Sequence, residues 1–340
     1  MHKSILVLLL SLLFAACAKD SGMAPLDETQ YPKPDVKKVL TGSFVTFYEK
    51  DNWAPYQWSS LLEGMKKIGM RTVIAQFSAH DQQVWFDTNE TFVTQKSKYA
   101  LGRLLAAAAE KGMEVYVGLY FDESYWKNQT SETWLDEHAN RCNRMATEIN
   151  ALFGTQSAFK GWYIPHEPEP YAYNTEEKMN LFRTHFVDRI SNHLHQLNNK
   201  PVSIAAFWNS ELSTPEQLKT FMSQLGKCNL QVIMLQDGVG VEHVSLDRLE
   251  TYYKHAEAGL FGEGSAFKGE FWTDLETFNK DNTPALISRV AQQLSIEMSI
   301  PRITRAVSFD YYSNMCPTGP FGRKAQKLRQ DYLNLVKTGK

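Results

Sequence analysis

The sequence is poor in cysteine, and the few cysteines it has lie far apart. Its 340 residues include four, Cys17, Cys142, Cys228 and Cys316, and no two have the close spacing of zinc ligands or of a redox pair. The three that follow Cys17 are an odd number, so they cannot form a complete disulfide framework. Buried free thiols are the simpler interpretation.

Several motifs that mark cofactor or metal sites are also missing. There is no HExxH sequence, and the one HxH pair, His193 and His195, falls late in a predicted helix. No GxGxxG follows the first predicted strand, and no GxSxG elbow occurs. We therefore expect neither a catalytic metal nor a cofactor. The formal net charge is -2, without a basic block, which argues against nucleic acid as a partner.

Residues 1–17 have the pattern of a bacterial lipoprotein signal. A short positive region ending at Lys3 precedes an apolar run that is too short to span a membrane, and small residues lead to Cys17. We predict that Cys17 is lipidated; the alternative is an ordinary signal peptide cleaved near Ala16. Residues 18–39 then form a flexible tether. The expected location is the outer membrane, with exposure on the cell surface as an option, and the lipid anchor is the only expected membrane contact.

From residue 40 to residue 340 short β-rich runs alternate with longer amphipathic runs. The predicted strands cover residues 42–48, 71–77, 113–121, 159–165, 202–208, 230–236, 267–275 and 303–311. The predicted helices cover residues 57–69, 97–112, 131–153, 174–197, a segment from 214, 245–258, 284–298 and 322–336. Eight strand–helix units predict one α/β domain, a (β/α)₈ TIM barrel. An open doubly wound sheet is the alternative.

In such barrels the functional side chains follow the C-terminal ends of the strands. Every predicted strand here ends in polar residues, aromatic residues or both. Those after the first three strands include Tyr48, His80, Asp122 and Glu123. We predict that the substrate is bound by Trp126, His166, Glu169, Trp208, Asn209, Gln236, Asp237, Trp272, Asp310 and Tyr311.

This mixture of side chains favours a carbohydrate ligand. Carboxylates and amides hydrogen-bond to hydroxyl groups, and aromatic faces cover the apolar C–H patches of sugar rings. Arg and Lys are nearly absent from the strand ends, which argues against phosphorylated substrates. A single aromatic residue is more often part of the core than a platform for a sugar ring, and it is the combined set at one face that favours carbohydrate. If the carbohydrate interpretation holds, one cleft should be surrounded by Trp126, Trp208, Trp272 and Tyr311, with Gln236 and Asp237 reaching into it.

The most specific local signal is Glu167, which lies between Pro165 and Pro168 at the end of the fourth predicted strand. Flanking prolines hold a carboxylate rigidly, as an acid/base catalyst requires. The segment resembles the strand-four motif of clan A glycoside hydrolases, Asn-Glu-Pro, with His166 in place of the asparagine that holds the substrate's 2-hydroxyl group. The alternative role for Glu167 is to brace its loop.

The resemblance to clan A implies that Glu167 is the general acid/base and that a second carboxylate follows strand seven. Glu276 is the best-placed candidate for this second carboxylate, and Asp274 is the reserve. The distance between the two carboxyl groups would decide between retention and inversion of the anomeric configuration.

Over its whole length after the signal, the sequence resembles the bacterial family known as domain of unknown function 4434. The resemblance rests on Trp58 and the segments 61–74, 161–167 and 234–240. It implies a glycoside-hydrolase-like barrel, often a lipoprotein, but no particular reaction. Two hypotheses remain: a glycosidase that acts on an extracellular glycan, and a non-catalytic barrel that binds glycan at the cell surface.

Overall fold

The computed structural model describes residues 39–338, so the predicted signal and nearly all of the predicted tether lie outside the described residues. Eight parallel strands close into a barrel in the order β1-β12-β11-β10-β9-β8-β6-β2. They are β1 (Leu40–Val45), β2 (Thr72–Ala75), β6 (Glu114–Gly118), β8 (Phe159–Ile164), β9 (Val202–Ala206), β10 (Val232–Gln236), β11 (Glu270–Glu276) and β12 (Ile303–Phe309). The predicted (β/α)₈ fold is confirmed.

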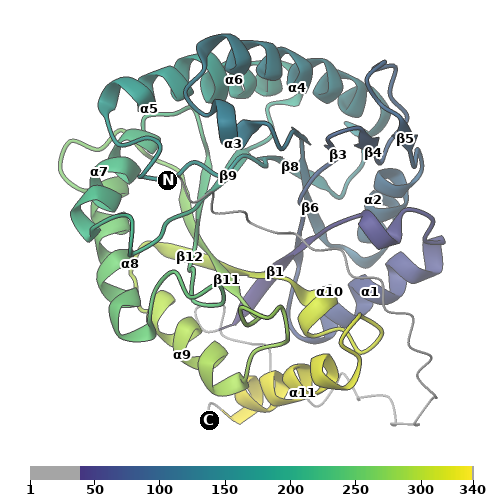
Figure 1. Ribbon diagram of the computed structural model, residues 1–340. Coiled ribbons are helices and arrows are strands. Elements are labelled where there is room, and N and C mark those ends of the chain that lie inside the picture. Colours follow the sequence, from purple (N-terminus) through teal and green to yellow (C-terminus); the bar gives the residue numbers. More distant parts are fainter. Residues whose placement is uncertain (1–38, 339–340) are drawn as a thin grey trace.

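Helices follow the strands and form a ring outside the barrel, which Figure 1 shows along the barrel axis. They are α1 (Pro55–Lys67), α2 (Ala100–Lys111), α4 (Glu132–Phe153), α5 (Glu176–Phe182), α6 (Asp188–Asn198), α7 (Pro215–Leu225), α8 (Leu246–Phe261), α9 (Ile287–Glu297) and α11 (Arg323–Thr338). Two short helices, α3 (Tyr125–Asn128) and α10 (Tyr311–Asn314), follow strand ends. Between residues 39 and 338 no helix is long and apolar enough to cross a membrane.

Helix boundaries follow local chemistry. The Thr214 hydroxyl accepts a hydrogen bond from the backbone N–H of Gln217 at 3.3 Å, and Pro215 occupies the first turn of α7. The predicted helix 174–197 is less regular than its pattern suggests. A π-helical turn, Arg183–Val187, separates α5 from α6.

The strands separate two hydrophobic cores. The inner core takes at least one side chain from every barrel strand: Phe44, Ile74, Tyr116, Tyr163, Ala205, Val232, Met234, Trp272 and Val307. The larger outer core lies between the strands and the helices, and it includes Phe271 and Leu275 of β11. Because side chains alternate along a strand, residues in step with the inner core point into the barrel.

A small second sheet lies beside the barrel, in the order β5-β4-β3-β7. Its strands are β3 (Ala79–His80), β4 (Gln83–Val84), β5 (Gln95–Lys96) and β7 (Tyr120–Phe121). β3 follows β2 closely and β7 follows β6, so two neighbouring barrel strands continue into this sheet. The sheet lies between α2 and α4 in Figure 1 and was not predicted from the sequence.

Candidate active site

Three carboxyl groups meet at the C-terminal end of the barrel. Asp274 and Glu276 are in step with Trp272 on β11, so their side chains point inward. Glu167 lies three residues beyond the end of β8. Burial raises the pKa of Asp274 well above its usual value, and the charges of Glu276, Asp237 and Glu167 raise it further, so these carboxyl groups lie near one another.

Glu167 has the properties of an acid that holds its proton near neutral pH. Burial is the main cause, and it raises the pKa of Glu167 to about 7. The side chain of Gln236 on β10 hydrogen-bonds to this carboxyl group and opposes that shift, whereas the nearby charge of Glu123 adds to it. Gln236 therefore reaches the site, as its inward position on β10 requires.

Glu276 is held by backbone N–H groups of the loop after β10. The N–H of Val241 donates to Glu276 Oε2 at 2.9 Å, and the N–H of Gly240 also donates to this carboxylate. A Cβ atom at position 240 would lie 2.4 Å from the carbonyl oxygen of Phe278 and 2.8 Å from Glu276 Oε2, so this contact requires glycine. Burial and then the charge of Asp237 raise the pKa of Glu276 to about 8.

Asp274 differs from its two neighbours in its hydrogen bonding. It is 3% exposed, and its Oδ1 atom has no hydrogen-bond partner among the described residues. The charges of Glu276 and Glu167 disfavour ionisation of Asp274. At Glu276 the backbone donors oppose the rise in pKa, but burial and the charge of Asp237 outweigh them.

A second group of carboxyls lies on the other side of β11. Asp237 accepts hydrogen bonds from the N–H groups of Val239 at 3.0 Å and Glu276 at 3.3 Å and from the side chain of Gln293. Its carboxyl group also hydrogen-bonds to that of Glu297 on α9. The structure thus corrects the expectation that Asp237 reaches into the cleft, because its side chain points outward, toward α9.

We expected four aromatic residues to surround one cleft. This prediction is wrong for three of the four. Trp208 is 1% exposed and stacks on Tyr252 of α8, with ring centroids 4.1 Å apart. Trp272 is fully buried inside the barrel, and its indole Nε1–H donates to Glu270 at the first position of β11. Tyr311, at the start of α10, is 1% exposed.

Only Trp126 of that set lies at the surface, where it is 37% exposed. The other three aromatic residues pack beneath or behind the strand ends. An aromatic side chain is large enough to fill either core, and the outcome depends on which side of the wall its position faces. The aromatic residues therefore carry less of the carbohydrate argument than their number suggests.

His166 also lies behind the barrel wall. It is fully buried, and its Nε2 atom lies 3.0 Å from Nε2 of His138 on α4. A ring nitrogen of His138 hydrogen-bonds to the carbonyl oxygen of Tyr120, and burial lowers the pKa of His138 to about 3. This packing does not fit contact between His166 and a substrate at the barrel mouth, and it corrects that expectation.

Three further predicted binding residues brace loops. Glu169 accepts hydrogen bonds from the backbone N–H groups of Tyr171 and Ala172. Asn209 accepts one from the N–H of Glu211 at 2.8 Å. Asp310 caps α10 by accepting from the N–H of Ser313 at 2.6 Å. Their carboxylate and amide oxygens are thus committed to the protein backbone.

Three side chains near the candidate site, Tyr48, His80 and Glu123, were noticed at predicted strand ends but were not predicted as site residues. His80 Nε2 lies 3.1 Å from Glu123 Oε1, and His80 Nδ1 lies 2.7 Å from the hydroxyl oxygen of Tyr48. The charge of Glu123 acts on both Glu167 and Tyr48. Their positions at the ends of the first three predicted strands were the only signal for them in the sequence.

One surface cluster has the residue types of a metal site. Potential ligand atoms of Glu132, Asp136 and His185 lie within 4.8 Å of one another on α4 and the π-helical turn. However, Asp136 already forms an ion pair with Arg189, at 2.9 Å. The cluster lies in the outer helical layer. Among the described residues, no contact links it to the three carboxyl groups at the barrel mouth.

The chain is similar in structure to several glycoside hydrolases. A Bacteroides thetaiotaomicron protein with a provisional alpha-L-fucosidase assignment aligns with a TM-score of 0.74 and 18% identity, over 94% of this chain and 99% of that one. An endo-beta-1,4-mannanase from Thermotoga petrophila aligns with a TM-score of 0.59 and 12% identity, over 89% of this chain and 78% of that one. A beta-glucosidase from Thermotoga maritima aligns with a TM-score of 0.55 and 11% identity, over 90% of this chain and 99% of that one. At these identities the similarity shows the fold alone.

Sequence comparison identifies a relative and a family. The uncharacterized protein YbcH of Escherichia coli (strain K12) is 23% identical over 199 residues, which are 58% of this chain and 64% of that protein. The chain thus spans less than two thirds of the length of that relative. The model of a domain of unknown function, DUF4434, matches residues 40–320. The chain therefore belongs to the DUF4434 family.

Proposed function

We propose that this protein is a glycoside hydrolase that acts on an extracellular glycan, with Glu167 as general acid/base and Glu276 as the partner carboxylate. The observation that carries this proposal is the convergence of Glu167, Asp274 and Glu276 at the C-terminal end of the barrel. Catalytic groups of TIM barrels lie at this end. The similarity of the fold to glycosidases and a mannanase supports the same class of substrate.

The surroundings of the two glutamates suit them to different roles. Burial lets Glu167 keep a proton near neutral pH, so it can protonate the leaving-group oxygen of a glycosidic bond. The backbone N–H groups of Gly240 and Val241 stabilise the anionic form of Glu276, although burial and the charge of Asp237 still raise its pKa to about 8, so the anion is the minor form at neutral pH. This anion either attacks the anomeric carbon directly or activates a water molecule, according to the separation of the two groups. Asp274 is the reserve for the second role.

The experiment is a screen of glycans and aryl glycosides for hydrolysis, followed by a comparison of variants on any substrate found. We expect Glu167→Gln to lower turnover by roughly 10²–10⁴-fold. Aryl glycosides with good leaving groups should lose less, because they need less protonation. Glu276→Gln should also lose most activity. Glu270→Gln is the matched control, because Glu270 lies on the same strand as Glu276 but at its opposite end.

Full activity in Glu167→Gln would refute the assignment. One observation favours the alternative, a barrel that binds glycan without cleaving it: Glu276 is 5% exposed and lies under the loop after β10. Binding without turnover across a broad panel would support that alternative. The extracellular location rests on the predicted lipidation of Cys17. If that prediction holds, Cys17→Ser releases the protein from membrane fractions, and unchanged membrane binding would contradict it.

A further inference from the structure

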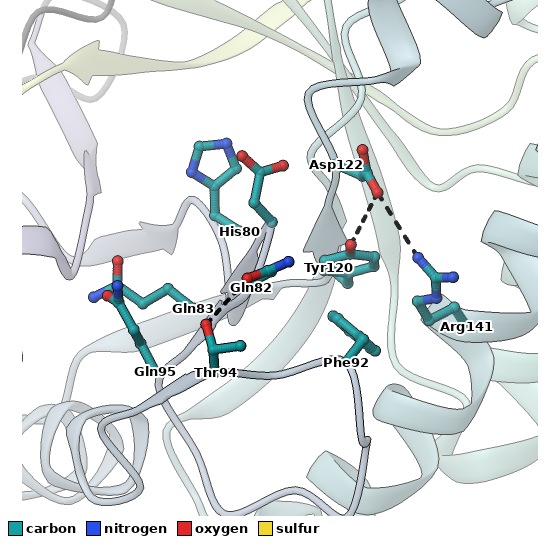
Figure 2. A pocket seen from close by; sticks show the side chains of 10 residues that line it. His80, Gln82, Gln83, Phe92, Thr94, Gln95, Tyr120, Asp122 and Arg141 are labelled. Atoms are coloured by element: carbon teal, nitrogen blue, oxygen red, sulfur yellow. Dashed lines mark hydrogen bonds and ion pairs between the residues drawn. The ribbon is translucent and has the colours of Figure 1, made fainter.

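A polar hollow of about 620 Å³ lies on the small sheet beside the barrel. Figure 2 shows side chains from several elements around it. His80 and Gln83 come from β3 and β4, Gln95 from β5, and Arg141 from α4. β3, β4 and β5 lie close together in the sequence, and the pairing of β3 with β7 brings them next to the segments that carry Tyr120 and Arg141.

The hollow borders the carboxyl groups at the barrel mouth. His80 lines the hollow, and its Nε2 atom lies 3.1 Å from Glu123 Oε1. Glu123 in turn lies close enough to Glu167 for its charge to raise the pKa of that group. A chain molecule seated over Glu167 could therefore continue past His80 and Glu123 into the hollow.

The lining offers hydrogen-bond donors and acceptors whose orientation is fixed by the protein. The carbonyl oxygen of the Gln82 side chain accepts from the hydroxyl of Thr94 at 3.1 Å, which turns the amide nitrogen away from Thr94 (Figure 2). Asp122 accepts from the hydroxyl of Tyr120 at 3.1 Å, and Arg141 lies 3.7 Å from the same carboxylate oxygen. A guanidinium has five N–H groups, so the ion pair with Asp122 and the hydrogen bond to Tyr120 still leave donors for a ligand.

The charges of the lining favour a neutral ligand. The lining holds two carboxylates, Asp81 and Asp122, and one guanidinium, Arg141, while His80 is hydrogen-bonded to a third carboxylate, that of Glu123. An acidic sugar would meet a net negative surface. Neighbouring hydroxyl groups of a neutral sugar can donate to the carboxylates and accept from the amides and the guanidinium.

We propose that this hollow is a binding subsite for neutral sugar units of a chain glycan, beyond the unit that is held at Glu167. The proposal rests on one part of the proposed function, namely that a glycan binds at the barrel mouth. It adds that the substrate is an oligosaccharide or polysaccharide rather than a single glycoside, because a ligand that reaches both places must be several sugar units long.

The test measures binding rather than turnover, so that it does not depend on hydrolysis. Neutral manno- and gluco-oligosaccharides of one to six units are titrated into the full chain carrying Glu167→Gln and followed by calorimetry. Gln82→Ala and Gln95→Ala are added separately. Both side chains are exposed, so neither change should unfold the protein. Gln292→Ala, at an exposed position of α9, is the matched control.

We expect affinity to rise with chain length and each of the two hollow variants to lower it by roughly 3–10-fold for the longest ligands, with no change for monosaccharides. The control should bind like its parent. Equal binding by the hollow variants, tighter binding of oligouronates than of the neutral series, or no binding by any oligosaccharide would overturn the proposal. Binding in the hollow by a protein that hydrolyses nothing would refute only the catalytic role.

Discussion

The two faces of β11 carry similar acidic groups in opposite circumstances. On the inner face Asp274 and Glu276 share the barrel mouth with Glu167, and Asp274 Oδ1 has no hydrogen-bond partner among the described residues. On the outer side, Glu297 accepts from the hydroxyl of Thr273 at 2.7 Å and hydrogen-bonds to Asp237. Burial raises the pKa of carboxyl groups on both faces.

The hydrogen bonding of Asp237 and Asp274, and not the pKa, separates the two groups, although Oε1 of Glu297 also lacks a partner among the described residues. A buried polar network that satisfies most of its members strengthens a fold. The outer carboxyls receive backbone, amide and hydroxyl donors, and Gln293 also donates to the carbonyl oxygen of Glu276 at 3.1 Å. They therefore position the strand end. On the inner face, Asp274 has a raised pKa and a carboxylate oxygen with no partner among the described residues, which is typical of a functional site. A shifted pKa alone would have assigned both groups to catalysis.

The largest effect on stability should come from the outer face. We expect Asp237→Ala to lower the free energy of unfolding by about 1–3 kcal/mol or more, because its donors from Val239, Glu276 and Gln293 lose their acceptor. Asp274→Asn should change it by less than about 1 kcal/mol, because few contacts depend on that group. Urea unfolding at neutral pH measures both. Equal losses in the two variants would break the comparison.

A smaller effect should appear in the pH dependence of stability. The pKa values of Glu167 and Glu276 are raised from 4.5 to about 7 and about 8, so the folded protein binds these protons more tightly than the unfolded chain. Their contribution is complete below pH 4.5 and is lost as the pH rises through those values. Buried His138 and His166 have lowered pKa values and act in the opposite direction below pH 6.5, so the melting temperature should fall most clearly between about pH 6.5 and pH 8.

Glu276→Gln should flatten that fall, because it removes one of the groups that titrate. The expected change in slope is at most about 1.4 kcal/mol per pH unit, the value for one proton. Thermal melts of the wild type and the variant across this range measure it, with Glu270→Gln as the control. A slope that is unchanged in Glu276→Gln would show that this carboxyl group titrates alike in the folded and unfolded states.

The fold and part of the site could be predicted from the sequence because they depend on periodicity. The predicted strand of residues 159–165 and the observed β8, Phe159–Ile164, agree closely, and so do the predicted helix of residues 131–153 and α4. Glu167, Gln236, Asp274 and Glu276 were chosen by position, and they do lie near one another. In a TIM barrel the functional side chains follow the strand ends, so position along the sequence is enough to select candidates.

The wrong predictions concern which side of the barrel wall a side chain faces. Gln236 and Asp237 are consecutive and face opposite cores, and the same alternation places Trp208 and His166 outside the barrel. A one-residue uncertainty at a strand end exchanges the two faces. The polar hollow could not be predicted either, because it depends on the pairing of β3 with β7. Such short strands leave almost no periodic pattern.

The most direct test of the central claim is the pH dependence of kcat/KM for hydrolysis by the wild type and by Glu167→Gln. The shifted pKa values, about 7 for Glu167 and about 8 for Glu276, predict a bell-shaped profile with its optimum between them. Activity should fall at lower pH, where the partner carboxylate is protonated, and at higher pH, where the acid has lost its proton. Glu167→Gln should lose the alkaline limb on substrates with good leaving groups. A variant profile that keeps both limbs at wild-type rates would contradict the assignment of Glu167 as the catalytic acid.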